Sequence, residues 1–207
     1  MRELSQSTAG ARGHEARERV LRSAERLVAM RGFDRVRLSD VARAAGVSIG
    51  SLQHHFETRE RLLREAFLWS AEQHVREWAA AADRGGDPWE RLVSLLEAAL
   101  PEDEFPLHAA LWIEFCAVAS RDDQSRAVMA RVYEQWRVPL RAAIEDGVAA
   151  GLFHPAAPLD DVVDILLAQM DGLDVAGTVA PTGIDVRRLR TLLLATARMA
   201  LRVDGPT

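Results

Sequence analysis

The stretch from Leu38 to Phe56 constrains the fold of this chain more than any other part of it. Ser39 predicts the cap of a first short helix, whose narrow apolar face lies within residues 41–45. Gly46 follows where a helix needs a left-handed residue in order to end, and glycine adopts that conformation without a Cβ penalty. Ser48 then predicts the cap of a second short helix. Two short helices joined by a tight turn are the geometry of a helix-turn-helix unit.

The second helix, predicted over residues 49–55, has two chemically different faces. Leu52 and Phe56 lie four residues apart and are expected to turn toward a core. The outward residues are Gly50, Ser51, Gln53 and His54. Small residues let a helix approach the wall of a groove, while glutamine and histidine can hydrogen-bond base edges or phosphates. The pattern therefore predicts a helix that enters the major groove of DNA.

Residues from Gly32 to Leu63 resemble the DNA-binding domain of the TetR family of transcriptional repressors. The matching residues are Gly32-Phe33, Leu38-Ser39-Asp40-Val41-Ala42, Ala45-Gly46-Val47-Ser48, Gly50-Ser51-Leu52, His54-His55-Phe56 and Leu62-Leu63. The chain departs from the family at Gln53, where tyrosine is usual, and at Arg59, where lysine is usual; arginine keeps the charge and can bind a phosphate through its planar fork. The DNA-contacting residues expected from the pattern and the resemblance are Arg37, Ser39, Ser48, Ile49, Gly50, Ser51, Gln53, His54, His55 and Arg59, of which Arg37, Ser39, His55 and Arg59 are expected to hold phosphates.

The charge distribution agrees with a nucleic-acid-binding front half. The whole chain carries a net charge of −5, but residues 1–64 hold 13 Arg against 8 Asp and Glu, a charge of +5. Residues 65–207 hold 13 Arg against 23 Asp and Glu, a charge of −10. The front half is attracted to phosphate and the back half is repelled by it, so only the front is expected to lie on DNA.

Helical periodicity recurs along the whole chain and no strand pattern is present, which predicts an all-α fold of about nine helices. We expect a disordered arm over residues 1–13, a helix-turn-helix DNA-binding domain over 14–60 and a helical ligand-binding and dimerisation domain over 61–207. Helices are expected at 14–31, 59–83, 88–100, 107–120, 123–150, 158–177 and 185–203, besides the two of the helix-turn-helix. The helix that starts at Arg59 spans the boundary between the domains, so it is expected to carry movement from one to the other.

The second half resembles one branch of the TetR family, the branch that includes the betaine-responsive (BetI-like) repressors. The matching segments are Leu111–Phe115, Tyr133, Trp136, Gly151–Phe153 and Asp171–Leu173. Members of the family are homodimers that pair mainly through their last two helices. The apolar stripes of these two helices supply the interface residues that we expect, which are Val163, Leu166, Leu167, Leu189, Leu193 and Ala197.

Aromatic and polar residues in the helices that surround the family's effector pocket are the candidates for ligand binding. Tryptophan can stack on an aromatic ligand or cage a cation, and polar side chains in apolar stripes can orient a ligand. The expected residues are Trp69, His74, Trp78, His108, Trp112, Cys116, Tyr133, Trp136, Gln169 and Met170. Glu114 and Asp171 are further polar candidates. The alternatives stay open: the aromatic residues can be ordinary core, and the polar ones satisfied hydrogen-bonding partners.

Other classes of function have little support in the sequence. His54 and His55 are adjacent on a helix, point about 100° apart and have no third ligand nearby, so no metal site is expected. Cys116, the single cysteine, lies in a strongly apolar stretch and is read as an inert thiol in a reducing, cytoplasmic protein. We expect no cofactor, no signal peptide and no membrane span.

The hypothesis that follows is a homodimeric repressor that binds a palindromic operator in double-stranded DNA and is released by a small-molecule effector of unknown identity. The alternative is a helical small-molecule-binding protein, or an enzyme, that does not bind an operator. The sequence contains no glycine-rich phosphate loop and no evident catalytic set, which argues against the enzyme. Binding to DNA that weakens steeply with added salt would separate the two hypotheses.

Overall fold

The structure is a computed structural model that describes residues 2–82, 86–179 and 184–203. Within these ranges every regular element is helical, which confirms the all-α prediction. The elements are α1 (Arg2–Arg31), a short 3-10 turn η1 (Phe33–Arg35), α2 (Leu38–Ala45), α3 (Ile49–Phe56), α4 (Arg59–Ala82), α5 (Pro88–Ala98), α6 (Phe105–Ala119), α7 (Asp123–Ala149), α8 (Leu159–Val179) and α9 (Val186–Leu201). Asp83, predicted as the end of α4, lies outside the described residues.

Local sequence signals account for several helix ends. Gly46 ends α2 in the left-handed conformation at φ 67°, as predicted. Asp87 caps α5, and its side chain and that of Glu90 each accept a hydrogen bond from the other residue's backbone N–H. Thr58 Oγ1 accepts the Arg61 N–H at the start of α4, 3.1 Å away. These ends depend on residues within one turn, which is why the sequence alone predicts them.

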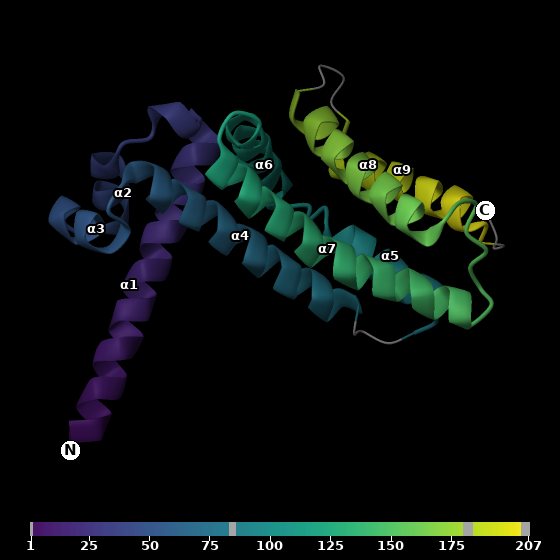
Figure 1. The fold of residues 1–207 in the computed structure, drawn as a ribbon, viewed down its shortest axis with the longest axis horizontal. Helices are drawn as coiled ribbons and strands as arrows, with labels where there is room; N and C mark the ends of the chain where they lie inside the picture. Colours follow the sequence, from purple (N-terminus) through teal and green to yellow (C-terminus); the bar gives the residue numbers. More distant parts are fainter. Residues whose placement is uncertain (1, 83–85, 180–183, 204–207) are drawn as a thin grey trace.

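Two apolar cores hold together the helices drawn in Figure 1. The first lies among α1 to α4 and extends onto α6 and the start of α7. The second lies among the end of α4, α5, α6, α7, α8 and α9. Because α4, α6 and α7 contribute to both cores, the two domains are joined by continuous packing and not only by a linker.

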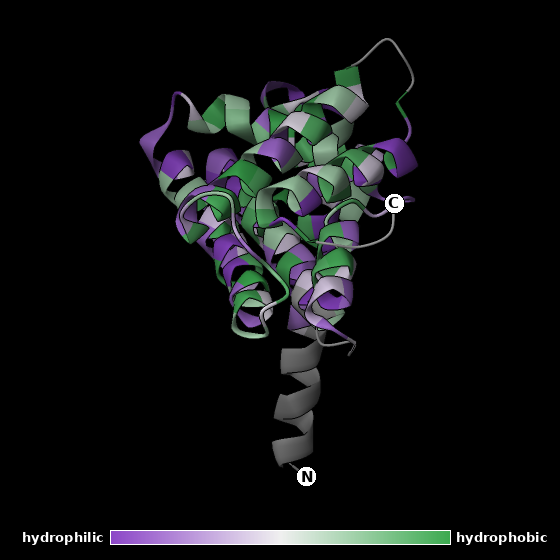
Figure 2. Ribbon diagram, turned by 90° about the vertical axis from the view of Figure 1, so that its right-hand side faces the viewer, coloured by the Kyte–Doolittle hydropathy of each residue, from purple (hydrophilic) through white to green (hydrophobic). Residues whose placement is uncertain are grey.

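Hydrophobic and hydrophilic residues alternate along individual helices (Figure 2), as expected for amphipathic helices around a shared core. In the described ranges no helix is long and apolar enough to cross a membrane.

The structure corrects the predicted cap of α2. Ser39 lies inside the helix, and the capping position is Arg37, whose backbone N–H donates to Asp40 Oδ2 over 3.1 Å. Ser39 was expected to stand before the helix and accept one of its free N–H groups, but the bond that the structure has at this end runs from the N–H of the capping residue Arg37 back to Asp40 in the first turn. At the other end of the domain, where a disordered arm was expected over residues 1–13, the structure continues α1 as helix back to Arg2.

The structure also corrects the predicted dimer interface. All six predicted side chains are at most 4% exposed within a single chain, so none of them can face a partner; they are Val163, Leu166, Leu167, Leu189, Leu193 and Ala197. They form part of the second core, because the widest apolar stripes of α8 and α9 pack against the other helices of the same chain. The sequence indicated that these stripes are buried, but it did not indicate whether helices of the same chain or of a partner cover them.

Candidate functional site

The first candidate site is the outward face of α3 and the turn before it. Ser48 caps α3, with its Oγ accepting the Ser51 N–H over 3.1 Å. Leu52 and Phe56 are 1% and 3% exposed and fasten α3 to the first core. Because these two residues fix one side of the helix inward, the opposite side is presented to solvent at the end of the molecule (Figure 1).

Most of the predicted DNA-contacting residues lie on this surface. Seven of them are exposed, namely Arg37, Ser48, Ile49, Gly50, Gln53, His54 and His55. Ile49, at the start of α3, is a large apolar side chain that is 45% exposed and does not belong to the core. Ser39 and Ser51 are half-buried beside the exposed set. The arrangement offers polar hydrogen-bonding groups and one apolar contact to a groove.

Arg59 has a structural role that the sequence did not indicate. Its guanidinium donates to the carbonyl oxygens of Phe33 and Val36, pairs with Glu60 and lies 5.1 Å from the centre of the Phe33 ring. These contacts fasten the corner between α1 and α2 to the start of α4. A phosphate contact by Arg59 stays a prediction. The Arg59 side chain is only 22% exposed, and a phosphate would have to bind it beside the contacts that it already makes within the protein.

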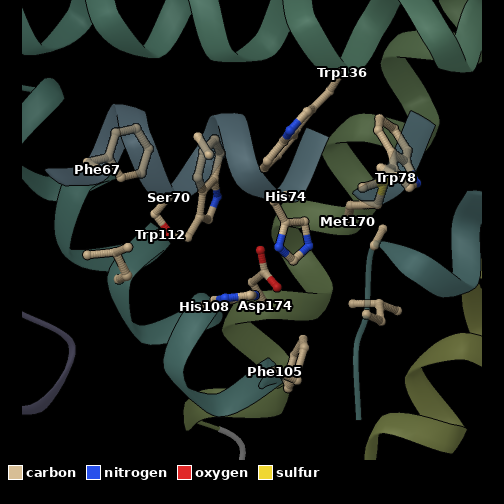
Figure 3. A pocket seen from close by; sticks show the side chains of 14 residues that line it. Phe67, Ser70, His74, Trp78, Phe105, His108, Trp112, Trp136, Met170 and Asp174 are labelled. Carbon is tan, nitrogen blue, oxygen red and sulfur yellow. The ribbon is translucent and has the colours of Figure 1, made fainter. Parts of the chain in front are cut away.

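The second candidate site is a cavity of about 60 Å³ that is bordered by α4, α6, α7 and α8 together with the loop before α6 (Figure 3). It is lined by Phe67, Ser70, Ala71, His74, Trp78, Ala99, Leu100, Phe105, His108, Leu111, Trp112, Trp136, Met170 and Asp174. In the same measure one water needs about 10–15 Å³, so the cavity has room for a small organic molecule of several heavy atoms.

Three tryptophan side chains make one wall of the cavity. The ring centres of Trp112 and Trp136 are 4.8 Å apart with the planes tilted by 30°, and Trp78 meets Trp136 edge-on at 6.3 Å. Phe67 extends this wall, 5.8 Å from Trp112. Aromatic faces carry partial negative charge, and several of them around one space attract a cation, by about 2 kcal/mol or more where water is excluded.

Asp174 is the acidic group of the cavity and points into it beside His74 (Figure 3). Burial, and then the nearby Asp171, raise the pKa of Asp174 from 3.8 to about 7. Burial lowers the pKa of His74, and burial together with His74 lowers the pKa of His108 to about 4. Both imidazoles are therefore neutral at pH 7, and no arginine is among the residues that line the cavity. The site holds one carboxyl group and no opposing positive charge.

Several polar atoms at the cavity are left without partners. His108 Nδ1 and Trp136 Nε1 are buried and have no hydrogen-bond partner within the described residues. The two imidazole rings of His74 and His108 touch edge-on at 4.4 Å and separate the cavity from a polar hollow between α1, α4 and α6. A buried polar atom without a partner costs free energy, which a polar ligand can recover by supplying one.

Six of the ten predicted ligand-binding residues line this cavity: His74, Trp78, His108, Trp112, Trp136 and Met170. The other four lie outside its lining. Trp69 lines the adjacent polar hollow, where it stacks under Arg22. Tyr133 lies behind Trp112 and donates its hydroxyl to Asp171, while the Gln169 amide donates to the Leu192 carbonyl oxygen and ties α8 to α9.

Cys116, the fourth, packs against the first core, and burial raises the pKa of its thiol to about 12. Sequence reasoning missed Asp174, although it lies one helical turn after Met170 and so shares its face of α8. Of the two further polar candidates, Asp171 is engaged by Tyr133, and Glu114 faces away from the cavity toward α1.

Comparison with known proteins identifies the family. Residues 20–66 match the family described as bacterial regulatory proteins, tetR family, and residues 88–202, more than half of the chain, match the BetI-type transcriptional repressor, C-terminal. This chain belongs to the TetR family. It is a DNA-binding transcriptional regulator with a BetI-type C-terminal domain, and not an enzyme.

Relatives of this TetR-family regulator match most of its length. The HTH-type transcriptional regulator BetI of Agrobacterium fabrum is 28% identical over 174 residues, which are 81% of this chain and 80% of that protein. A regulator of Saccharomonospora viridis, solved in complex with choline, is 26% identical and superposes with a TM-score of 0.83 over 93% of this chain and 100% of that one. A TetR-family regulator from Rhodococcus sp. is 25% identical, with a TM-score of 0.79 over 90% and 99% of the two chains.

Proposed function

We propose that this regulator represses transcription by binding a palindromic operator as a homodimer, and that a small quaternary ammonium cation releases it. The exposed face of α3 supports operator binding, because it places Gln53, His54 and Ile49 on one side of a helix that is anchored from the other. The positive charge of residues 1–64 supplies attraction to phosphate. A two-fold symmetric dimer requires a two-fold symmetric operator.

The outward side of α8 is the surface that we propose for dimerisation, in place of the buried stripe. Ile165, Val175 and Val179 are 49%, 48% and 67% exposed. With the exposed Ala168 and Gly172 they recur at intervals of three, four, three and four residues, which is one straight seam along a helix. Next to it α9 exposes Met199 by 69%. A second copy of the chain fits this seam, because small residues at its middle permit close helix approach.

The observation that carries the effector class is the wall of three tryptophans opposite the lone carboxyl group of Asp174. Aromatic faces and one carboxylate suit a cation that cannot donate strong hydrogen bonds, and the neutral histidines do not oppose it. The choline bound by the relative from Saccharomonospora viridis is of this chemical class. Binding of the cation shifts the equilibrium toward the state with low operator affinity only to the extent that the cation binds this state more tightly than the other.

Selection of duplexes from a random pool by the purified protein tests the operator proposal. We expect an enriched palindrome whose binding weakens steeply with salt, and enrichment of no sequence by a folded dimer would refute it. Fluorescence anisotropy on that operator then tests the effector. Choline is expected to release the protein, whereas the neutral analogue with carbon in place of the ammonium nitrogen is not; equal effects of the two would refute the cation.

A further inference from the structure

Glu114 on α6 makes a polar contact between the cavity-bearing domain and the DNA-binding domain. Its Oε2 accepts the backbone N–H of Phe33 over 2.8 Å, directly after the end of α1. Gly32 has a φ of +84°, and a Cβ there would lie 3.2 Å from the Glu114 carboxylate oxygens. The carboxylate is therefore seated closely against the backbone at the corner between α1 and α2.

The other side of α6 is a wall of the cavity. His108, Leu111 and Trp112 line it, and they precede Glu114 within two turns of the same helix. Because α6 is one continuous helix over this length, a shift of its backbone at His108 or Trp112 also moves the backbone at Glu114. The helix thus presents one face to a ligand and the other to the DNA-binding domain.

The corner that Glu114 holds is connected onward to the helix-turn-helix. The Phe33 N–H donates to Glu114, and the Phe33 carbonyl oxygen accepts a hydrogen bond from Arg59 at the start of α4. Arg59 also binds the carbonyl oxygen of Val36, two residues before α2. A displacement of the Glu114 carboxylate consequently bears on the start of α2 and, through the short turn, on α3.

A second contact fastens α6 and α4 to α1 further back. The buried Glu25 of α1 accepts a hydrogen bond from Ser70 Oγ over 2.7 Å and lies 4.0 Å from His108 Nε2. Ser70 and His108 both line the cavity. Glu25 lies about two helical turns before Phe33, so α1 and the η1 turn that follows it are held to α6 at two points, of which the one at Glu114 lies at the corner between α1 and α2.

We propose that Glu114 is the positioning residue through which occupancy of the cavity reaches the DNA-binding domain. The proposal rests on the effector response proposed above. When the cavity is filled, α6 moves, the Glu114 carboxylate no longer matches the Phe33 N–H, and the corner is released. Without Glu114 the cavity can still bind its ligand, but the reading helix no longer responds to it.

The test compares operator affinity with the cavity empty and filled, in the full-length protein. The cavity is filled in two independent ways, by choline and by Ala71→Leu, since Ala71 lines the cavity from α4. In the wild-type background each is expected to weaken operator binding by roughly tenfold, within the usual range of allosteric coupling. In the Glu114→Ala background the same changes are expected to weaken it by no more than about twofold, with the affinity for choline unchanged.

Two variants serve as controls. Glu114→Gln keeps an oxygen that accepts the Phe33 N–H. It is expected to keep the wild-type ratio between operator affinity with the cavity empty and operator affinity with the cavity filled. Glu134→Ala removes an exposed glutamate of α7 that has no hydrogen bond or ion pair among the described residues, and is expected to change nothing. Glu114→Leu, which keeps the side-chain volume, replaces the alanine variant if circular dichroism shows that alanine impairs folding.

The outcomes separate this proposal from the effector proposal. Failure of choline to bind the wild-type protein refutes the cation, and the Ala71→Leu comparison still decides the role of Glu114. If filling the cavity weakens operator binding in Glu114→Ala as much as in the wild-type protein, the coupling role of Glu114 is refuted. An unchanged operator affinity in folded Ala71→Leu refutes it as well, because a filled cavity would then have no effect to transmit.

Discussion

Replacing Asp174 by asparagine is expected to make the ligand-free protein more stable while it weakens effector binding. Burial raises the pKa of this carboxyl group from 3.8 to about 7, so the folded protein holds a proton that the unfolded chain releases. The folded state is therefore penalised as the pH rises from about 4 to about 7. Asparagine has the same shape, stays neutral and escapes this penalty.

The magnitude follows from the shift in pKa. About three pH units at about 1.36 kcal/mol each give a stabilisation of the variant of about 4 kcal/mol at pH 8. At pH 5 most of the penalty is absent, and the difference should be below about 2 kcal/mol. For a chain of this size about 1 kcal/mol corresponds to roughly 2–4 °C in Tm, so the variant should melt roughly 8–16 °C higher at pH 8.

Thermal unfolding followed by tryptophan fluorescence at pH 5 and pH 8 measures this difference. Both proteins must be compared at the same concentration, because the Tm of the proposed dimer would depend on the protein concentration. Asp103→Asn, which neutralises an exposed carboxylate in the loop before α6, is the matched control and should leave Tm nearly unchanged at both pH values. A Tm gap that is the same at both pH values, or a variant less stable than wild type at pH 8, would refute the assignment of a buried, proton-holding Asp174.

The same substitution should cost choline affinity on the order of 2 kcal/mol or more, roughly thirtyfold, because a buried cation loses its counter-charge. In isothermal titration of the wild-type protein, affinity should fall about tenfold for each pH unit below about 7, since the Asp174 carboxyl group must lose its proton to pair with the cation. Asp174→Asn should show no such slope. A wild-type affinity that is constant between pH 5 and pH 8 would contradict the pairing.

Gln53→Ala should weaken operator binding in an anisotropy titration without changing the molar mass of the dimer, and unchanged binding would remove Gln53 from the contact surface. Trp112→Ala should weaken the response to choline, by about 1 kcal/mol or more, and leave operator binding intact; loss of folding would instead mark Trp112 as core. Ile165→Glu places a charge in the proposed α8 seam and should produce monomers in light scattering, whereas a dimer that persists would exclude this seam as the interface.

The helix-turn-helix could be predicted almost residue by residue because its determinants are local. Gly46 supplies the left-handed end of α2, Ser48 caps α3, and Leu52 and Phe56 set its buried side. The exception at α2, where Asp40 and Arg37 replace Ser39 at the helix start, is a displacement of one or two residues within the same local chemistry.

The cavity was only partly predictable. Tryptophans on helical faces predicted an aromatic site, and Trp78, Trp112 and Trp136 do meet there, although they come from three different helices. The polar groups of the cavity were harder to predict, because Asp171 and Asp174 lie close together on α8. In the folded chain Asp171 accepts a hydrogen bond from Tyr133, whereas Asp174 lines the cavity. A helical pattern gives the direction of a side chain, but not what lies opposite it.

The sequence by itself determined the helical class, the helix-turn-helix and its exposed face, because periodicity, capping and left-handed glycine act within a few residues of the chain. The tertiary structure alone decided which stripe of α8 is buried in the core and which is exposed, which of its carboxyl groups lines the cavity, and that Glu114 contacts Phe33 and not the cavity. These outcomes depend on contacts between residues far apart in the chain, and packing selects among faces that the sequence leaves equivalent.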